Sequence, residues 1–356
     1  MKSPLVTNQE SSAALSQLIN HQVRLAARPV GLPTMDNWQL TTEPVMPPGN
    51  DGIVVAVEMI SLDPAMRGWM NEGRSYIAPV GLGDVMRAGA LGKIIASSNS
   101  NWQVGDYVTG TFGVQQYCTL VAEKIRVAGV SRIDPALAPL SAWLNALGMP
   151  GMTGYFGLLE VGQPKPGETV VVSGAAGAVG QMVGQVARIH GCRVVGIAGG
   201  KAKCDFVVDE LGFDACIDYK AGSVREGLKR DCPQGVDIYF DNVGGDILDT
   251  LLTRINMRAR IVICGAISQY NATQPVQGPK NYLSLLVNRA RMEGIVVFDW
   301  AARFPEAVRQ IAGWMREARL QSREHLLEGG VQRFPEALNM LFSGDNFGKL
   351  VLKVAP

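Results

Sequence analysis

Hydrophobic and polar positions change their spacing near residue 169, and the change divides the chain into two kinds of sequence. Before it, short apolar or alternating stretches such as 23–26 and 52–59 lie between loops rich in proline and glycine. That pattern is typical of β strands. After it, strand-sized apolar runs alternate with helical stretches, which predicts βαβ units around a mostly parallel sheet. The runs fall at 169–173, 193–197, 215–218, 236–241, 260–264 and 294–298, and the helical stretches at 179–190, 203–211, 223–230 and 246–255.

The end of the chain returns to the first kind of sequence. Residues 349–354 alternate like a strand, and such a strand cannot extend a parallel sheet without a crossover connection. We therefore predict an α/β protein with a flexible arm over 1–16, a β-rich domain over 17–140 and 315–356, and a doubly wound parallel-sheet domain over 141–314. The apolar run 295–300 is predicted to form the last strand, at the edge of the parallel sheet.

Composition narrows the function classes. Among 356 residues, 33 Lys and Arg oppose 32 Asp and Glu, so the basic excess of a nucleic-acid binder is missing. Two long uncharged stretches, 135–159 and 169–187, contain prolines or polar side chains, and we expect neither to span a membrane. The six cysteines form no Cys-x-x-Cys pair, and the first 30 residues lack an apolar leader. We expect reduced thiols in a cytoplasmic protein.

A glycine turn follows the first apolar run of the α/β region. Ser173 begins the sequence Ser-Gly-Ala-Ala-Gly-Ala-Val-Gly, which ends a predicted strand and opens a predicted helix. This is the context of a dinucleotide-binding turn, although Ala175 takes the place of its first glycine. Gly177 would let backbone N–H groups approach a pyrophosphate, and Gly180 would let the helix pack closely on its strand. The alternative is an ordinary tight turn between strand and helix.

The second apolar run ends in a glycine-lined segment that contains lysines. A site for NAD places Asp or Glu there to bind the ribose 2′-hydroxyl, but the chain has Gly199, Gly200, Lys201, Ala202 and Lys203. An ammonium group can pair with a 2′-phosphate, so the segment favours NADPH. Alternatively, both lysines simply begin a solvated helix.

Zinc chemistry and a serine or cysteine nucleophile have little support. A catalytic zinc needs three protein ligands, and the chain contains only His21, His190 and His325, far apart in sequence. No Gly-x-Ser-x-Gly turn surrounds Ser173. We therefore predict no metal and assign the chemistry mainly to the cofactor.

Several sequence blocks resemble the zinc-independent medium-chain dehydrogenase/reductases, in the branch of the prostaglandin reductases, leukotriene hydroxydehydrogenases and curcumin or alkenal reductases. The resemblance extends from about residue 22 to the end. Its blocks are Ser-Leu-Asp-Pro-Ala-Met-Arg-Gly from Ser61, Gly-Met-Pro-Gly-Met-Thr-Gly-Tyr-Phe-Gly from Gly148, Ala-Ala-Gly-Ala-Val-Gly from Ala175, Phe-Asp-Asn-Val-Gly-Gly from Phe240, Cys-Gly-Ala-Ile-Ser-Gln-Tyr-Asn from Cys264 and Asn-Phe-Gly-Lys-Leu-Val from Asn346.

The resemblance implies a GroES-like β-rich domain, a Rossmann domain and an active-site cleft between them. It implies NADP(H) as the cofactor and reduction of the carbon–carbon double bond of α,β-unsaturated carbonyl compounds, with hydride delivered to the β-carbon. The cofactor-binding residues that it implies are Thr153, Gly177, Ala178, Val179, Gly180, Lys203, Tyr219, Asn242, Cys264, Gly265, Ala266, Ile267, Ser268, Gln269, Tyr270, Ile295, Val296, Val297 and Asn346.

Four residues are candidates for contact with the substrate. Tyr270 is the first candidate for the donor to the substrate's carbonyl oxygen, and the alternative is that it only contacts the cofactor. Tyr76 and Trp69 are expected to be pocket walls. Arg67 could bind a substrate carboxylate or could be tied to its own loop. Ala65 and Val287 replace tyrosines of some family members, so the pocket is expected to be wider and more apolar there.

Other functions remain open from sequence alone. Quinone reduction uses the same fold and cofactor, oxidation of a secondary alcohol lacks its usual acid/base pair, and a non-catalytic NADPH-binding protein is a third possibility. Related proteins pair their last strand across a dimer, so we expect a homodimer.

Overall fold

The computed structural model describes residues 15–354 and divides them into two compact units. The first contains residues 15–144, 326–341 and 350–354, and the second contains residues 145–325 and 342–349. Most of the predicted arm, residues 1–14, lies outside the described part. Leu15 is already packed against Val45, Val54 and Ala96, so the first unit begins no later than this residue.

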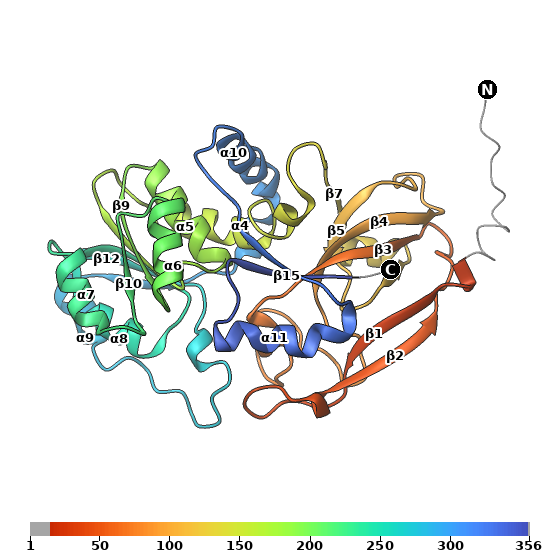
Figure 1. Cartoon of the computed structure of the whole chain (residues 1–356), viewed down its shortest axis with the longest axis horizontal. Coiled ribbons are helices and arrows are strands. Elements are labelled where there is room, and N and C mark those ends of the chain that lie inside the picture. Colours follow the sequence, from red (N-terminus) through yellow and green to blue (C-terminus); the bar gives the residue numbers. More distant parts are fainter. Residues whose placement is uncertain (1–14, 355–356) are drawn as a thin grey trace. The chain divides into compact units, whose positions relative to one another are not determined.

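The first unit is built on β strands (Figure 1). β1 and β2 form an antiparallel pair, and a larger sheet has the order β14-β15-β3-β4-β5-β7, with β6 also paired to β3. The strands are β1 Ile19–Leu25, β2 Trp38–Pro44, β3 Ile53–Ser61, β4 Gly89–Ser97, β5 Tyr107–Thr111, β6 Tyr117–Leu120, β7 Ser131–Arg132, β14 Glu324–Leu327 and β15 Lys349–Lys353. Short helices connect them: η1 Met35–Asn37, α2 Ala65–Trp69, α3 Ala122–Val127, η2 Leu140–Leu144, η7 Val331–Arg333 and α11 Phe334–Ser343.

The tail strand is where the sequence predicts it. β15 pairs antiparallel with β3, with Val351 opposite Ser61 and Lys353 opposite Met59. Val351 also packs against Leu91 and Leu144 in a small core cluster. β15 is therefore part of the larger sheet of the first unit.

The second unit contains a six-stranded parallel sheet in the order β10-β9-β8-β11-β12-β13. Its strands are β8 Thr169–Ser173, β9 Arg193–Ala198, β10 Ala215–Asp218, β11 Val236–Asp241, β12 Ile255–Ile263 and β13 Arg291–Gly294. The α-helices are α4 Met149–Phe156, α5 Ala178–Ile189, α6 Lys201–Asp205, α7 Val224–Asp231, α8 Gly245–Leu252, α9 Leu283–Asn288 and α10 Phe304–Arg316. Shorter helical segments are η3 Gly157–Gly162, η4 Phe206–Glu210, η5 Ile267–Gln269 and η6 Val297–Arg303.

This strand order is that of a doubly wound dinucleotide-binding sheet, and it confirms the predicted fold class. The chain starts in the middle of the sheet with β8, winds outward to β10, and then resumes on the other side of β8 with β11. Side chains of β8 are buried along its whole length, as a strand covered on both faces requires. The reversal between β8 and β11 is the position at which such sheets bind ligands.

The predicted last strand is wrong. The edge strand is β13, which ends at Gly294, and the apolar residues beyond it enter the 3-10 helix η6. Ile295 continues the backbone pairing by one hydrogen bond to Ile263, and Val297 is buried, but Phe298 is 48% exposed. A short apolar run satisfies a strand or a helical turn equally well, so periodicity could not separate them.

The boundaries of the two units differ from the predicted domain limits at the C-terminal side. Residues 315–325 and 342–349 belong to the parallel-sheet unit instead of the β-rich one. The backbone N–H groups of Gln321 and Arg323 donate to the side chains of Gln185 and Gln181 on α5, and these contacts hold the segment there. Both glutamines are buried, a feature that the sequence pattern does not reveal.

Candidate cofactor and substrate sites

In the glycine turn after β8, the backbone of α5 packs closely against the backbone of residues 174–175. Gly174 has a φ of +61°, and Gly177 is the N-cap of α5. A Cβ placed on Gly180 would overlap the carbonyl oxygen of Gly174 and lie 2.8 Å from the Cα of Ala175. Only glycine lets α5 begin this close to the strand, so the N-terminus of the helix is available to a phosphate group. The geometry fits the predicted dinucleotide turn.

We expect Gly180→Ala to damage this turn. The added methyl group meets main-chain atoms that cannot rotate away, so the free energy of unfolding should fall by about 1–3 kcal/mol. NADPH binding should weaken by about tenfold or more, which corresponds to ~1.4 kcal/mol. Thermal melting and fluorescence titration measure both. Gly313→Ala in α10 is the matched control, because a Cβ there meets nothing within 4 Å. Unaltered melting and NADPH affinity in Gly180→Ala would contradict this account of the turn.

The two lysines after β9 have different surroundings. Lys201 forms an exposed ion pair with Asp205 at 2.6 Å. Lys203 is partly buried, and its Nζ donates to the carbonyl oxygen of Gly344 at 2.7 Å. Burial and the positive charge of Lys220 hold the pKa of Lys203 below its ordinary value. The charge of Asp345 acts in the opposite direction. Lys203 is therefore a partly buried cation to which an added phosphate would supply a further counter-charge.

The glycines beside Lys203 make room for neighbouring groups. Gly200 has a φ of +97°, and its N–H donates to the carboxylate of Asp218 at 2.8 Å. A Cβ on Gly199 would lie 2.6 Å from the hydroxyl oxygen of Tyr219, so the tyrosine ring lies directly against the bare backbone. Lys203 follows β9 and Tyr219 follows β10, so both residues lie at the carboxyl end of the parallel sheet.

The loops after β11 and β12 form one hydrogen-bonded structure. Asn242 donates its side-chain amide to the carbonyl oxygen of Ser173, which ties the end of β11 to the end of β8. The N–H groups of Cys264 and Gly265 donate to Asp241, and those of Ile267 and Ser268 donate to Asn242 and Val243. The predicted segment 264–270 therefore lies beside Asn242, at the point where the strand order reverses.

Asp241 is the organising residue of these loops, and sequence reasoning missed it. Its Oδ1 accepts from the hydroxyl groups of Ser173 and Tyr239 at 3.0 and 2.8 Å, and from the N–H groups of Val243 and Gly244 at 3.0 and 2.9 Å. Its Oδ2 is buried and has no hydrogen-bond partner among residues 15–354. The sequence contained one signal of this role, because Asp241 is an acidic residue at the end of an apolar strand, directly before Asn242.

Tyr270 closes the loop back on itself. The N–H of Ala266 donates to the Tyr270 hydroxyl oxygen at 3.1 Å. A Cβ on Gly265 would lie 2.7 Å from that oxygen, so glycine is needed for the close approach. This contact uses the phenol oxygen as an acceptor and fixes the ring beside the turn 264–266. The phenol is therefore held in place by the main chain that is predicted to meet the nicotinamide.

The other predicted cofactor residues lie around the same edge or on neighbouring elements. Gly348 pairs with Gly177 as an isolated parallel bridge, and the side chain of Asn346 donates to the carbonyl oxygen of Gly348. Thr153 lies on α4, where its hydroxyl donates to Met149 one turn earlier. The segment 295–297 follows β13 directly. The segment 295–297 therefore lies at the carboxyl end of β13, and Gly348 lies beside the turn that follows β8.

The predicted substrate residues belong to the first unit. Arg67 is only 3% exposed, and its guanidinium donates to the carbonyl oxygens of Pro29 and Gly31 and to Asn71. These contacts favour the alternative in which Arg67 positions its own loops. Tyr76 is 57% exposed, and Trp69 ends α2 with Arg87 over its ring.

The thiols and histidines offer no nucleophile or metal site. Burial raises the pKa of the Cys118 and Cys264 thiols to about 12, so both stay protonated at neutral pH. His190 contacts the carbonyl oxygen of Val186, and His325 accepts from the N–H of Phe347. Across residues 15–354 no three His, Cys, Asp or Glu side chains gather as metal ligands. The residues within this described range do not fit a zinc site.

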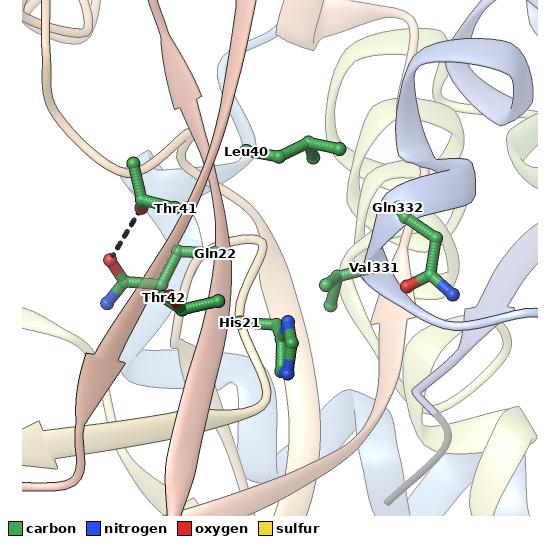
Figure 2. A pocket seen from close by; sticks show the side chains of 7 residues that line it. All are labelled: His21, Gln22, Leu40, Thr41, Thr42, Val331 and Gln332. Atoms are coloured by element: carbon green, nitrogen blue, oxygen red, sulfur yellow. Dashed lines mark hydrogen bonds between the residues drawn. The ribbon is translucent and has the colours of Figure 1, made fainter.

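A small cavity in the first unit lies at the β1–β2 pair (Figure 2). It has a volume of about 120 Å³ and is lined by His21, Gln22, Leu40, Thr41, Thr42, Val331 and Gln332. Figure 2 shows Gln22 and Thr41 pointing toward each other, joined by a 3.3 Å hydrogen bond. The cavity contains none of the predicted site residues, and its volume is about that of a few water molecules.

None of the helices within residues 15–354 combines the length and the apolar character that a membrane crossing requires.

Comparison with known proteins gives matches over nearly the whole chain. A model of the N-terminal domain of oxidoreductases matches residues 21–127, and a model described as zinc-binding dehydrogenase matches residues 178–313. The NADPH-dependent curcumin reductase of Escherichia coli is 39% identical over 341 residues, covering 94% of this chain and 97% of that protein. The NADP(+)-dependent 2-alkenal reductase of Nicotiana tabacum is 38% identical over 345 residues, covering 95% and 98%.

Among solved structures, CurA of Vibrio vulnificus in complex with NADPH has a TM-score of 0.87 and 41% identity, covering 94% of this chain and 99% of that one. The similarity therefore includes both compact units.

Proposed function

The chain belongs to the zinc-independent branch of the medium-chain dehydrogenase/reductase family, and on that premise we propose that it is an NADPH-dependent reductase of the carbon–carbon double bond of α,β-unsaturated carbonyl compounds. The observation that carries the proposal is the sheet edge in the second unit. There the Gly180 turn, Lys203 and the loop ending at Tyr270 are assembled by main-chain contacts.

NADPH, when bound, supplies a hydride to the β-carbon of the substrate. Gly177 and the N-terminus of α5 hold its pyrophosphate, and Lys203 and Tyr219 hold its 2′-phosphate and adenosine. The rest of the cofactor is surrounded by Asn242, Thr153, Asn346 and the segments 264–270 and 295–297. The main chain of these segments provides orientation, which is a large part of what a protein contributes to cofactor chemistry.

The chain's own contribution to the chemistry is a hydrogen bond. Charge develops on the carbonyl oxygen of the substrate as the β-carbon receives hydride, and a donor aimed at that oxygen lowers the barrier. Tyr270 is the proposed donor, since a phenol carries an O–H group that can donate a hydrogen bond. Tyr76 and Trp69 form walls of the substrate site, and Arg67 positions the loops that carry them.

A panel of substrates tests the proposal. NADPH oxidation should be rapid with 2-alkenals and linear enones and slow or absent with quinones and saturated ketones. Turnover of quinones alone would replace the proposal with quinone reduction. NADPH binding without any turnover would indicate a binding protein.

We also propose that two copies associate through the edge of the parallel sheet. β13 has a strand neighbour on one side only in the described part of the chain, which leaves an unpaired edge. Leu285 of α9 packs into the core beside β12, whereas Leu283, Leu286 and Val287 are 57%, 74% and 67% exposed. An apolar face beside an open edge is typical of a surface that a second copy covers.

Sedimentation at micromolar concentration should give the mass of a dimer. Leu286→Lys should shift the mass toward the monomer, whereas Val104→Lys, at a 65% exposed residue of the first unit, should not. A monomeric wild-type protein would contradict the association.

We also propose a cytoplasmic location, because all six cysteines are free thiols and reduced thiols are typical of that compartment.

A further inference from the structure

We propose that the buried carboxylate of Asp241 favours the oxidised, positively charged nicotinamide over the neutral reduced one, and so makes the bound cofactor a better hydride donor. The inference rests on the proposed function and adds to it a residue that sets the balance between the two cofactor states. Asp241 is not among the residues expected to touch the cofactor. Its hydrogen bonds lie within the second unit.

The carboxylate of Asp241 has no cationic partner. The residue is 1% exposed. The donors to its Oδ1 are two hydroxyl groups and two backbone N–H groups, all uncharged, and its Oδ2 has no partner among residues 15–354. No lysine, arginine or histidine in this part of the chain is therefore hydrogen-bonded to the carboxylate. Acidic side chains are almost never fully buried unless they are paired, so the charge of Asp241 is open to a cation that arrives with a ligand.

The hydrogen bonds of Asp241 do not require its charge. An asparagine in its place has a side-chain carbonyl oxygen that could accept hydrogen bonds from the same donors as Oδ1. An acid adds only the negative charge and the second acceptor oxygen, and no described residue is hydrogen-bonded to that oxygen. A buried polar atom without a partner needs an explanation, and a cation that exists in one state of a ligand provides it.

Asp241 lies beside the loop that is predicted to meet the nicotinamide. It is the last residue of β11, next to the reversal of strand order, and Asn242 follows it directly. Its main-chain oxygen accepts from the N–H groups of Cys264 and Gly265 at 2.9 and 3.1 Å. These two residues begin the loop 264–270. Asp241 is therefore fixed to that loop by main-chain hydrogen bonds.

The negative charge of Asp241 acts on the side chains around it. Burial, and after it the charge of Asp241, raises the pKa of the Cys264 thiol to about 12. The same two causes hold the pKa of the Tyr239 hydroxyl well above its ordinary value. A charge shielded from water acts over a longer range than an exposed one, because the dielectric constant around it is low. Since only the oxidised nicotinamide ring is positively charged, this field favours the oxidised ring without any direct contact to the carboxylate.

Equilibrium binding of the two cofactor forms tests the inference. NADP+ and NADPH are titrated calorimetrically, without substrate, into wild type and Asp241→Asn. Asparagine has nearly the same shape and lacks the charge. We expect Asp241→Asn to weaken NADP+ binding about tenfold more than NADPH binding, which equals ~30 mV in the two-electron potential of the bound cofactor. A role in holding the loops would instead weaken both forms by the same factor.

Two control variants isolate the charge of Asp241. Asp218 also ends a strand of the parallel sheet and accepts from backbone N–H groups, but it lies next to Tyr219, at the predicted adenosine end. Asp218→Asn should therefore change the two affinities by the same factor. Tyr239→Phe keeps the charge of Asp241 and removes one of its donors, so it should leave the ratio of the two affinities within about twofold of the wild-type ratio.

The outcomes separate this inference from the proposed function. If Asp241→Asn selectively loses NADP+ binding but the wild type reduces no enone, the inference stands and the proposed function fails. If Asp241→Asn weakens both forms equally, or NADPH more, Asp241 has only a structural role and the inference is overturned. A wild type that binds neither form overturns both.

A second variant covers the case in which Asp241→Asn does not fold. Its amide N–H groups would lie at the position of Oδ2, where no acceptor is found among residues 15–354. Asp241→Ser removes the same charge, keeps a hydroxyl group as an acceptor and leaves room for a water molecule. It is expected to give the same selective loss of NADP+ binding, and an equal loss of both forms would overturn the inference.

Discussion

Replacing Tyr270 by phenylalanine is expected to slow hydride transfer in a single turnover by about 100- to 1000-fold, the loss that follows removal of one oxyanion donor. The structure holds the phenol in a fixed position, because the N–H of Ala266 donates to its oxygen and Gly265 leaves space for it. A fixed donor costs no reorganisation when charge develops on the substrate. Phenylalanine keeps the ring and loses only the hydroxyl group.

The same variant distinguishes donation to substrate from a role in holding the loop. If Tyr270 only maintains the turn 264–266, NADPH affinity and melting temperature should fall while the single-turnover rate at saturating NADPH is retained. If it donates to the substrate, the rate falls and NADPH affinity changes by less than about threefold, or ~0.7 kcal/mol. An unchanged rate in rapid-mixing experiments would remove Tyr270 from the catalytic step.

Lys203→Ala is expected to remove most of the preference for NADPH over NADH. The loss of a charged contact to the 2′-phosphate should raise the KM for NADPH by about 10- to 100-fold. NADH lacks that phosphate, so its kcat/KM should change by less than about twofold. Steady-state assays with both cofactors measure the ratio directly.

Lys201→Ala is the matched control for Lys203→Ala. Lys201 is two residues away and carries the same charge, but its side chain is 85% exposed and paired with Asp205. Its removal should leave the cofactor ratio nearly unaltered, since exposed pairs contribute little. Equal effects of the two variants would mean that general positive charge, and not a Lys203 contact, sets the preference.

The fold was predictable where local sequence and burial agree. The strands β8, β10 and β11 have the predicted bounds because each is a short apolar run between turn residues. The prediction failed at 295–300, where the chain enters a 3-10 helix at Val297, which is buried, while Phe298 is exposed. Hydrophobicity records that a residue is buried but not which backbone conformation buries it.

For the candidate site, the sequence predicts glycine turns that the structure contains, but it does not predict the buried polar contacts around them. Asp241 accepts a hydrogen bond from the hydroxyl of Ser173, which is 68 residues away in sequence. Lys203 donates one to the carbonyl oxygen of Gly344, which is 141 residues away. The partners of Arg67 were equally unpredictable, because its guanidinium donates to the carbonyl oxygens of Pro29 and Gly31, which are distant in sequence. Such contacts depend on the folded path of the chain, which no spacing in the sequence encodes.

The central claim is hydride delivery to the β-carbon of an enone, and isotopic labelling tests it most directly. The wild-type protein is incubated with a linear enone and NADPH carrying deuterium at the transferable C4 position, and the product is analysed by NMR. The account predicts a saturated ketone with deuterium on the β-carbon. An allylic alcohol with deuterium on the carbonyl carbon, or an unlabelled enone recovered after NADPH has been shown to bind, would contradict it.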